Sequence, residues 1–345
     1  MSDESKAQSS ARMITGRVMR LDAKVVHVEA DGEVRLCAIR GKLFENLGDR
    51  KGPVAVGDFV TVDPTGDPQS IESVHPRKNY LSRIASSHDP REQVLMANVD
   101  HMYVVASVAK PGFSSNRTDR ILAACQQRSI PATLIFNKID IDKKGVLEEL
   151  RETYAKAGVS MLETCATEGE DGPGMESLRG ALAGKTSGFY GASGVGKSTL
   201  LNAIDPELKI KVGKISKYWT AGKHTTTHSQ MHRLPIGDDS WVIDTPGIRV
   251  FRPFGLKRED LRDLFPDFLP YQKQCFFPNC THDHEPDCAV YDAVESGEIA
   301  PTRYGSYFEM LDEIGGPRGR RVDRRRSTVP GGHPTGPNEL LIAFA

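Results

Sequence analysis

The octapeptide Gly191-Ala-Ser-Gly-Val-Gly-Lys-Ser198 decides the fold of this chain. It follows a short apolar run, Ser187–Tyr190, and opens a helix-like run, Lys197–Ala203. This strand–loop–helix context is typical of a phosphate-binding loop, whose glycines let successive backbone N–H groups point at an anion. Lys197 is expected to reach the β- and γ-phosphates of a nucleotide and to act in catalysis, and the Ser198 hydroxyl to ligate Mg²⁺.

The surrounding sequence predicts a parallel sheet. Strand-like runs at Val99–Val108, Ala132–Phe136 and Trp241–Asp244 alternate with helix-like runs at Arg117–Arg128 and Lys144–Ala157. Because parallel strands need crossover connections, this alternation indicates an α/β domain, which we place at residues 92–250.

A second motif specifies the base. Asn137-Lys138-Ile-Asp140 follows the apolar run at 132–136. The Asp140 carboxylate can accept hydrogen bonds from guanine N1–H and N2–H₂, a donor pair that adenine lacks. Lys138 is expected to lie over the base and Asn137 to tie this loop to the phosphate-binding segment, so that the ligand is GTP or GDP. Thr164-Cys165-Ala166 fits a looser backbone contact to guanine O6.

A third motif, Asp244-Thr-Pro-Gly247, follows the run Trp241–Ile243. Asp244 is expected to hold Mg²⁺ through water, and the Gly247 amide to sense the γ-phosphate. In the polar stretch before it, Thr226 is the candidate for a hydroxyl that ligates Mg²⁺ only when the γ-phosphate is present.

The sequence allows two interpretations of the residue that activates water. Ile248 follows Gly247, where many GTPases carry a Gln that orients the attacking water. His224 is the candidate catalytic residue in its place, since a histidine can polarise water at neutral pH. The alternative is a solvent-exposed histidine without a role.

The order of these motifs is cyclically shifted. Ordinary GTPases run from the phosphate-binding loop to the guanine motif, whereas here the guanine motif and its cap precede residue 191. The same sheet can be built from such an order when the old termini are joined and new ones opened in a loop. We therefore predict a circularly permuted GTPase domain.

The N-terminal region predicts a small barrel. After a disordered segment at 1–12, five β-rich runs separated by turn residues occupy residues 13–85 and favour an OB-fold. Such barrels often bind single-stranded nucleic acid, but aromatic residues are sparse here, so both RNA contact and a structural role stay open.

The C-terminal region predicts a metal site. Cys275, Cys280, His282 and Cys288 have the spacing of a closed structural Cys₃His set for one Zn²⁺, in a mostly helical domain at 251–316. His284 is an alternative to His282. The Arg-rich segment at 317–345 is expected to be a flexible tail that binds phosphate backbones or is simply solvated.

Composition sets outer limits. The chain has 345 residues, net charge −1, six cysteines and no uncharged apolar window long enough for a bilayer. A net charge this close to zero excludes a protein that binds as a polycation over its whole surface, although it does not exclude a local basic patch. The polar N-terminus and the cysteine count favour a cytoplasmic protein without membrane contact.

Taken together, the barrel, the permuted motifs and the metal set resemble the bacterial small ribosomal subunit (30S) biogenesis GTPases of the circularly permuted RsgA/YjeQ family. The resemblance rests on GASGVGKSTL, GKHTTTH, DTPGIRVF and Cys-x4-Cys-x-His-x5-Cys, and covers about residues 13–315. One departure is Lys223, where Arg is expected, which loses the planar guanidinium fork.

The resemblance implies contact with 16S rRNA, 30S-stimulated hydrolysis of GTP, late 30S maturation and release of assembly factors by a monomer. It implies guanine contacts from Asn137, Lys138 and Asp140, hydrolysis by His224, and zinc ligation by the four residues named above. It implies phosphate contacts from Gly191, Ala192, Ser193, Gly194, Val195, Gly196, Lys197, Ser198 and Thr199. The alternatives are an RNA-binding assembly scaffold for which GTP is a conformational ligand, and a GTPase serving another RNA or translation partner.

Overall fold

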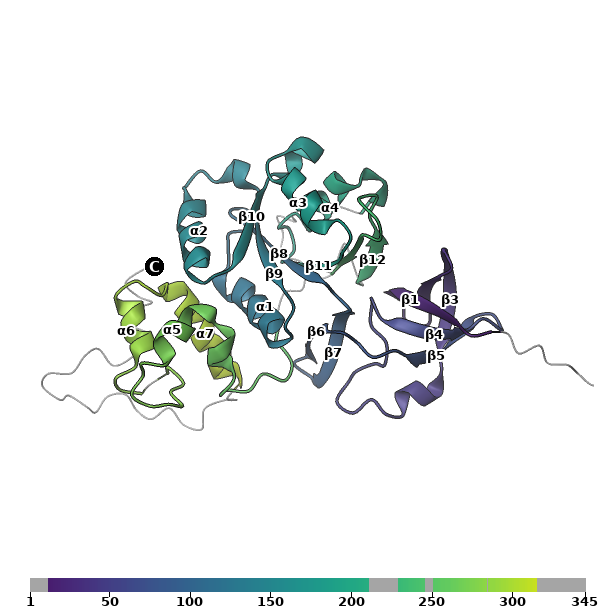
Figure 1. The fold of residues 1–345 in the computed structure, drawn as a ribbon, viewed down its shortest axis with the longest axis horizontal. Helices are drawn as coiled ribbons and strands as arrows, with labels where there is room; N and C mark the ends of the chain where they lie inside the picture. The colour runs from purple at the N-terminus through teal and green to yellow at the C-terminus, as the bar shows by residue number, and fades with distance from the viewer. Residues whose placement is uncertain (1–11, 211–228, 246–250, 284, 315–345) are drawn as a thin grey trace, which may run out of the picture.

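The structure, a computed structural model, describes residues 12–210, 229–245, 251–283 and 285–314. The predicted Arg-rich tail, and all but the last residue of the predicted disordered N-terminal segment, lie outside this part of the chain. In Figure 1 the N-terminal barrel and the C-terminal domain lie on opposite sides of a central α/β domain. None of the described helices has the length and apolar character needed to cross a bilayer.

The N-terminal region forms the predicted five-stranded barrel. Its strands are β1 (Ile14–Leu21), β2 (Val26–Ala30), β3 (Glu33–Ile39), β4 (Phe59–Asp63) and β5 (Gln69–Val74). They are hydrogen-bonded in the order β1-β2-β3-β5-β4, and pairing of β1 with β4 closes the barrel. Alternate residues point inward, and Val18, Val28, Val60 and Ile71 are completely buried. A 3₁₀ helix, η1 (Gly41–Phe44), lies between β3 and β4.

The central domain is a parallel sheet covered on both faces (Figure 1). Strands β10 (Ser160–Thr164), β9 (Ala132–Asn137), β8 (His101–Ser107), β11 (Thr186–Tyr190) and β13 (Trp241–Asp244) run parallel in that order, and β12 (Gln230–Arg233) is antiparallel to β13. The main helices are α1 (Ser115–Gln127), α2 (Val146–Lys156), α3 (Met175–Leu182) and α4 (Lys197–Ile204). Short 3₁₀ helices are η2 (Ile139–Ile141), η3 (Ala166–Asp171) and η4 (Pro206–Leu208).

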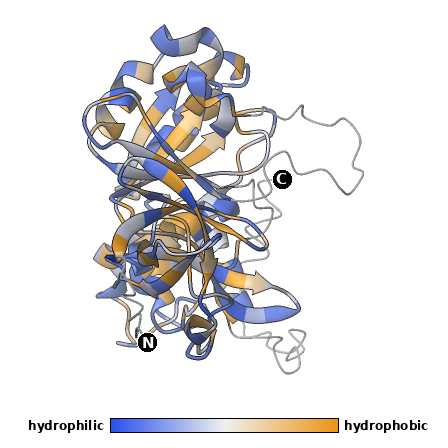
Figure 2. Ribbon diagram, turned by 90° about the vertical axis from the view of Figure 1, so that its right-hand side faces the viewer, coloured by the Kyte–Doolittle hydropathy of each residue, from blue (hydrophilic) through white to orange (hydrophobic). Residues whose placement is uncertain are grey.

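Two hydrophobic cores show which helices cover which face. Side chains of α1 and α2, such as Ile121 and Tyr154, pack in one core with Val104 of β8. Side chains of α3 and α4 pack in the other core with Tyr103 and Val105, the residues on either side of Val104. This alternation is the two-residue period of a strand buried on both faces. Figure 2 shows the hydrophobic colour gathered along these central strands.

The barrel is joined to the central sheet by direct strand pairing. Strand β1 pairs with β12 at Arg20 and Gln230, so that eleven strands form one continuous sheet. Beside this junction the buried Arg17 donates to the Thr186 hydroxyl at 2.9 Å. Its guanidinium carbon lies over the rings of Phe59 and Trp241, 4.9 and 5.9 Å from their centroids. The sequence patterns did not predict this junction.

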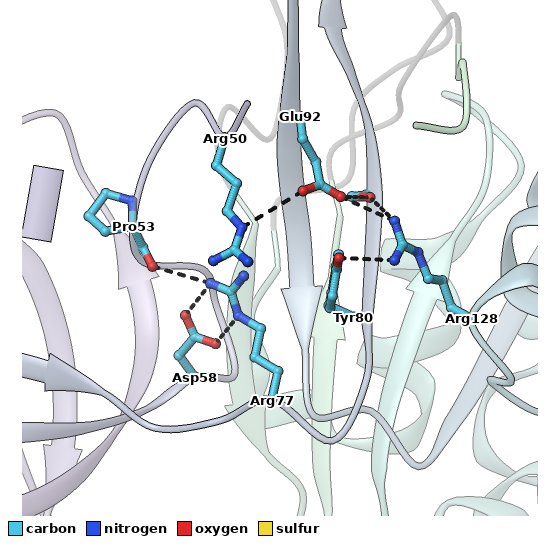
Figure 3. A network of polar contacts seen from close by, with 8 residues as sticks. Arg50, Pro53, Asp58, Arg77, Tyr80, Glu92 and Arg128 are labelled. Atoms are coloured by element: carbon cyan, nitrogen blue, oxygen red, sulfur yellow. Dashed lines mark hydrogen bonds and ion pairs between the residues drawn. The ribbon is translucent and has the colours of Figure 1, made fainter. Parts of the chain in front are cut away.

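A hairpin, β6 (Tyr80–Ser86) and β7 (Asp89–Ala97), lies across the predicted boundary between barrel and GTPase domain. The chain before it binds the barrel, because the Arg77 fork donates to both oxygens of the buried Asp58 at 2.7 and 2.8 Å (Figure 3). On the hairpin, Glu92 accepts from Ser82 at 2.7 Å and from Arg128, just beyond α1, at 3.2 Å. The hairpin and the segment just before it therefore contact both units.

The C-terminal domain is mostly helical, as predicted. It contains η5 (Leu261–Leu264), η6 (Pro266–Phe268), α5 (Leu269–Gln272), α6 (Ala289–Glu295) and α7 (Pro301–Ile314). Its core is rich in aromatic rings, with Phe265, Phe268 and Tyr307 almost completely buried, and it includes Ala123 of α1. This domain and the central domain thus share one packed interface.

Candidate nucleotide-binding site and metal centre

The phosphate-binding loop leaves the buried strand β11 and enters α4 at Lys197. Two of its glycines are required by geometry. A Cβ on Gly191 would lie 2.3 Å from the carbonyl oxygen of Val105, and one on Gly196 would lie 2.2 Å from Asn137 Nδ2. Gly196 also has a φ of 103°, which side chains rarely adopt. The remaining predicted phosphate contacts belong to the same loop and first turn: Ala192, Ser193, Gly194, Val195, Ser198 and Thr199.

The guanine motif lies directly beside this loop, although 54 residues separate Asn137 from Gly191. Strands β9 and β11 both flank β8 in parallel, so their carboxyl ends meet at one edge of the sheet. Buried Asn137 donates from Nδ2 to the Val195 carbonyl at 2.9 Å. Lys138, in the left-handed conformation at φ 64°, donates from Nζ to the Gly194 carbonyl at 2.6 Å. Two motifs predicted separately are thus tied together.

Asp140 is exposed in η2, immediately after these contacts. An exposed carboxylate on a loop held this firmly is accessible to a base edge. Cys165, in the predicted cap, is buried, and its Sγ lies 3.2 Å from the Thr167 hydroxyl. Burial raises the pKa of this thiol, so it stays protonated at neutral pH.

Thr164 was missed as a positioning residue by the sequence analysis, which used it only to mark the cap. Its hydroxyl is buried at the end of β10 and donates to Asn137 Oδ1 at 3.1 Å. Both polar ends of the Asn137 amide are therefore satisfied, one by β10 and one by the phosphate-binding loop. The sequence signal that could have identified Thr164 was a threonine at the end of the strand predicted after the guanine motif.

Lys197 and Asp244 are two buried, opposite charges at the phosphate end of the site. Lys197 donates from Nζ to the Gly191 carbonyl at 2.8 Å, and burial lowers its pKa although Asp244 opposes this. Burial raises the pKa of Asp244 to about 6, with Lys197 opposing. Asp244 Oδ1 is buried and has no hydrogen-bond partner among the residues that the structure describes. An orphaned carboxylate oxygen beside a phosphate-binding loop fits the predicted role of holding hydrated Mg²⁺.

Several predicted residues cannot be placed. His224, Thr226 and Gly247, together with Lys223 and Ile248, lie outside the described residues. Their predicted roles in hydrolysis, magnesium binding and γ-phosphate sensing stay predictions.

The four predicted zinc ligands converge in the C-terminal domain. The ligand atoms of Cys275, Cys280, His282 and Cys288 all lie within 4.8 Å of one another. His282 Nδ1 is 3.6 Å from Cys275 Sγ and 3.4 Å from Cys288 Sγ. Sulfur and nitrogen ligands of a tetrahedral zinc lie about 3.5–3.8 Å apart, so this donor set fits the ion. His284 lies outside the described residues.

Two tyrosines of α7 support the ligand loop, and neither was predicted. Tyr304 donates from its hydroxyl to the His282 carbonyl, and Tyr307 donates to the Thr281 carbonyl, each at 2.6 Å. The edge of Phe268 packs against the His282 ring. Burial lowers the pKa of His282 to about 4, with Arg262 adding to the effect, so the imidazole is neutral and can bind a metal.

These features define a phosphate-loop GTPase whose motifs run in circularly permuted order, flanked by a barrel and a Cys₃His domain. The chain belongs to the RsgA GTPase family, whose model matches residues 74–253. It is thus a ribosome biogenesis GTPase, as the sequence motifs predicted.

Relatives match most of the chain. The small ribosomal subunit biogenesis GTPase RsgA 2 of Bacteroides thetaiotaomicron is 39% identical over 82% of this chain and 91% of that protein. RsgA of Chlorobaculum tepidum is 39% identical over 87% and 98%. The crystal structure of YjeQ from Thermotoga maritima is 34% identical, with a TM-score of 0.65 over 90% of this chain and 100% of that one. YloQ, described as a circularly permuted GTPase, is 27% identical with a TM-score of 0.63 over 91% and 99%.

Proposed function

We propose that this chain hydrolyses GTP to GDP and phosphate when it binds the 30S subunit, and that it assists late 30S maturation by releasing assembly factors. The names of its relatives support the small subunit as partner. Contact with 16S rRNA through the barrel and the Arg-rich tail belongs to the same proposal, as does action as a monomer in the cytoplasm. So does the division into barrel (13–85), GTPase domain (92–250), metal-binding domain (251–316) and tail (317–345).

The observation that carries this function is the bonding between the two nucleotide motifs. Asn137 and Lys138 donate to the carbonyls of Val195 and Gly194, so the loop that selects guanine and the loop that binds phosphate are held as one site. A site that requires both guanine and polyphosphate binds GTP and GDP in preference to other nucleotides.

The proposed division of labour combines these placed residues with those that the sequence motifs predict. Asp140 accepts from the guanine edge, and Lys197 exchanges its bond to the Gly191 carbonyl for the β- and γ-phosphates. Ser198, Thr226 and Asp244 would hold the Mg²⁺ that accompanies GTP, and the ion would neutralise phosphate charge. Gly247 senses the γ-phosphate and His224 polarises the attacking water.

The Cys₃His set is proposed to hold one structural Zn²⁺. Four protein ligands complete a tetrahedron and leave no open position for catalysis. The metal then stabilises a loop whose carbonyls at Thr281 and His282 are also bound to α7 by the two tyrosine hydroxyls described above.

The first experiment is GTP turnover by the full chain alone, with isolated 30S subunits, and with 50S subunits as the control. Stimulation by 30S only is expected. Unchanged turnover in all three mixtures would remove the small subunit as activator while leaving nucleotide binding intact.

The scaffold hypothesis is separated from this one by His224→Ala. If hydrolysis drives function, this variant retains GTP binding and loses the 30S-stimulated turnover and the release of assembly factors. If GTP is only a conformational ligand, His224→Ala supports 30S maturation as well as the unsubstituted protein.

A further inference from the structure

Arg303, on α7 of the C-terminal domain, is buried in a network that reaches the GTPase domain. Its NH1 donates to Asp119 Oδ1 of α1 at 2.6 Å. Its Nε and NH2 donate to the two oxygens of Asp267 at 3.1 and 2.7 Å. The three side chains are at most 5% exposed. Burial alone would lower the pKa of Arg303, but the two carboxylates outweigh it and raise the pKa, so the guanidinium stays charged.

Asp119 connects this arginine to a third element. The same Oδ1 atom accepts a hydrogen bond from the Tyr154 hydroxyl of α2 at 2.9 Å. Arg303 also lies over the Tyr154 ring, 5.6 Å from its centroid. The buried Asp119 carboxylate therefore joins α1, α2 and α7. Because it is buried, it needs a positive counter-charge, which Arg303 of the C-terminal domain supplies.

From Tyr154 the contacts lead directly to the guanine motif. The Tyr154 ring packs edge-on against Phe136 at 6.2 Å and against Phe113 at 5.6 Å, and these two rings lie 5.8 Å apart. Phe136 immediately precedes Asn137 in β9. Phe113 belongs to the loop before α1. In the same loop, the Lys110 carbonyl accepts a hydrogen bond from Lys138 Nζ at 2.7 Å. Of the two residues that tie the guanine loop to the phosphate-binding loop, Asn137 thus directly follows a ring of this aromatic cluster, and Lys138 contacts the loop that carries another of its rings.

We propose that Arg303 is a positioning residue for the guanine-binding loop, acting through Asp119 and Tyr154, and that the metal-binding domain thereby contributes to nucleotide affinity. The inference rests on the proposed nucleotide site, but not on the 30S subunit. Removing the guanidinium leaves Asp119 buried without its counter-charge, so its carboxylate must take up a proton or admit water, or α1 and α2 must move apart. Each of these changes weakens the bond from the Tyr154 hydroxyl, which displaces the Tyr154 ring and loosens the segment that ends in Asn137.

The chain offers a matched control at the same interface. Arg120 of α1 donates through both terminal nitrogens to Glu313 of α7 at 2.6 and 2.7 Å, so it also joins the two domains through an arginine fork. Its remaining bond, from Nε, stays within α1 at Asn116. Arg120→Met therefore weakens the domain interface without touching Tyr154.

The test is the dissociation rate of a fluorescent GDP analogue from the full chain, measured by stopped flow with excess GDP. The temperature is chosen so that circular dichroism shows every variant folded. Arg303→Met is expected to speed dissociation about tenfold, within the roughly 5- to 150-fold range of typical couplings between sites, whereas Arg120→Met stays within about twofold. Failure of the unsubstituted chain to bind GDP would defeat the proposed function. Binding with equal rates for Arg303→Met and the unsubstituted chain would defeat this inference alone.

A double-mutant cycle tests the route. Tyr154→Phe removes only the hydroxyl and is expected to speed dissociation to a smaller extent. Combined with Arg303→Met it should add little, because both changes break one connection. Independent, multiplicative effects would overturn the route through Tyr154. If Arg303→Met does not fold, Arg303→Lys, which keeps the charge but loses the fork, takes its place, and normal dissociation from both Arg303→Lys and Tyr154→Phe would refute the proposal.

Discussion

Replacing Thr164 by valine tests whether the bonding around Asn137 determines nucleotide affinity. Valine has nearly the volume of threonine, so the substitution removes the hydroxyl donor while leaving the packing in place. Asn137 Oδ1, whose bond to Thr164 is 3.1 Å long, then becomes a buried acceptor without that partner. Leaving such a group unsatisfied costs about 1–3 kcal/mol.

The size of the effect on binding follows from this cost. If the nucleotide-bound state bears the full cost of the unsatisfied Asn137 oxygen, the affinity for GDP falls about 5- to 150-fold, since about 1.4 kcal/mol corresponds to each factor of ten. The expected value lies near the lower end, because Asn137 keeps its bond to the Val195 carbonyl. Stability should fall modestly, with a melting temperature lower by about 2–4 °C per kcal/mol.

Thr133→Val is the matched control. Thr133 is also a buried strand threonine, and its hydroxyl lies 2.8 Å from His101 Nε2 at the opposite end of β9. Isothermal titration with GDP should give normal affinity for Thr133→Val and weakened affinity for Thr164→Val, at similar melting temperatures. Equal affinities in the two variants would refute the reasoning, since the position of the lost hydrogen bond would then be irrelevant.

Three further predictions concern charge and metal. Because the folded-state pKa of Asp244 is raised to about 6, its protonation stabilises the nucleotide-free, metal-free protein at low pH, and this contribution is lost as the pH rises through about 6. Thermal melts across that range should show it, and Asp244→Asn should abolish it. Asp58→Ala leaves buried Arg77 without its counter-ion and should lower the free energy of unfolding by about 3–5 kcal/mol, measured by urea denaturation with the exposed pair Lys209–Glu207 as control site. Removing metal with a chelator should expose the aromatic core of the C-terminal domain to a hydrophobic dye, and Cys280→Ser should show the same exposure without chelator; a dye signal unchanged in both would contradict a structural metal.

The parts of the site that sequence analysis found are those encoded by short spacing. The phosphate-binding loop and the guanine motif each lie within eight residues, and each follows an apolar strand that a two-residue or continuous apolar pattern marks. The metal set lies within fourteen residues. The five strands of the barrel were also predicted, because turn residues separate them.

The parts that were missed depend on residues far apart in sequence. Arg303 and Asp119 are separated by 184 positions, and neither has a local pattern that distinguishes it from a surface charge. The hairpin formed by β6 and β7 was overlooked because the first half of β7, Asp89–Gln93, is charged and polar and so lacks an apolar strand pattern. Strand β12 is only four residues long, too short for a periodic pattern.

The single pairing of β1 with β12 has a consequence for shortened versions of the protein. Cutting away the barrel would uncover the backbone N–H and C=O groups on the outer edge of β12, a four-residue strand next to the buried β13. Bare edges of this kind recruit other strands, so a GTPase fragment lacking the first 74 residues is expected to self-associate. In the full chain the barrel pairs with that edge, so it is expected to prevent such aggregation independently of any contact with RNA.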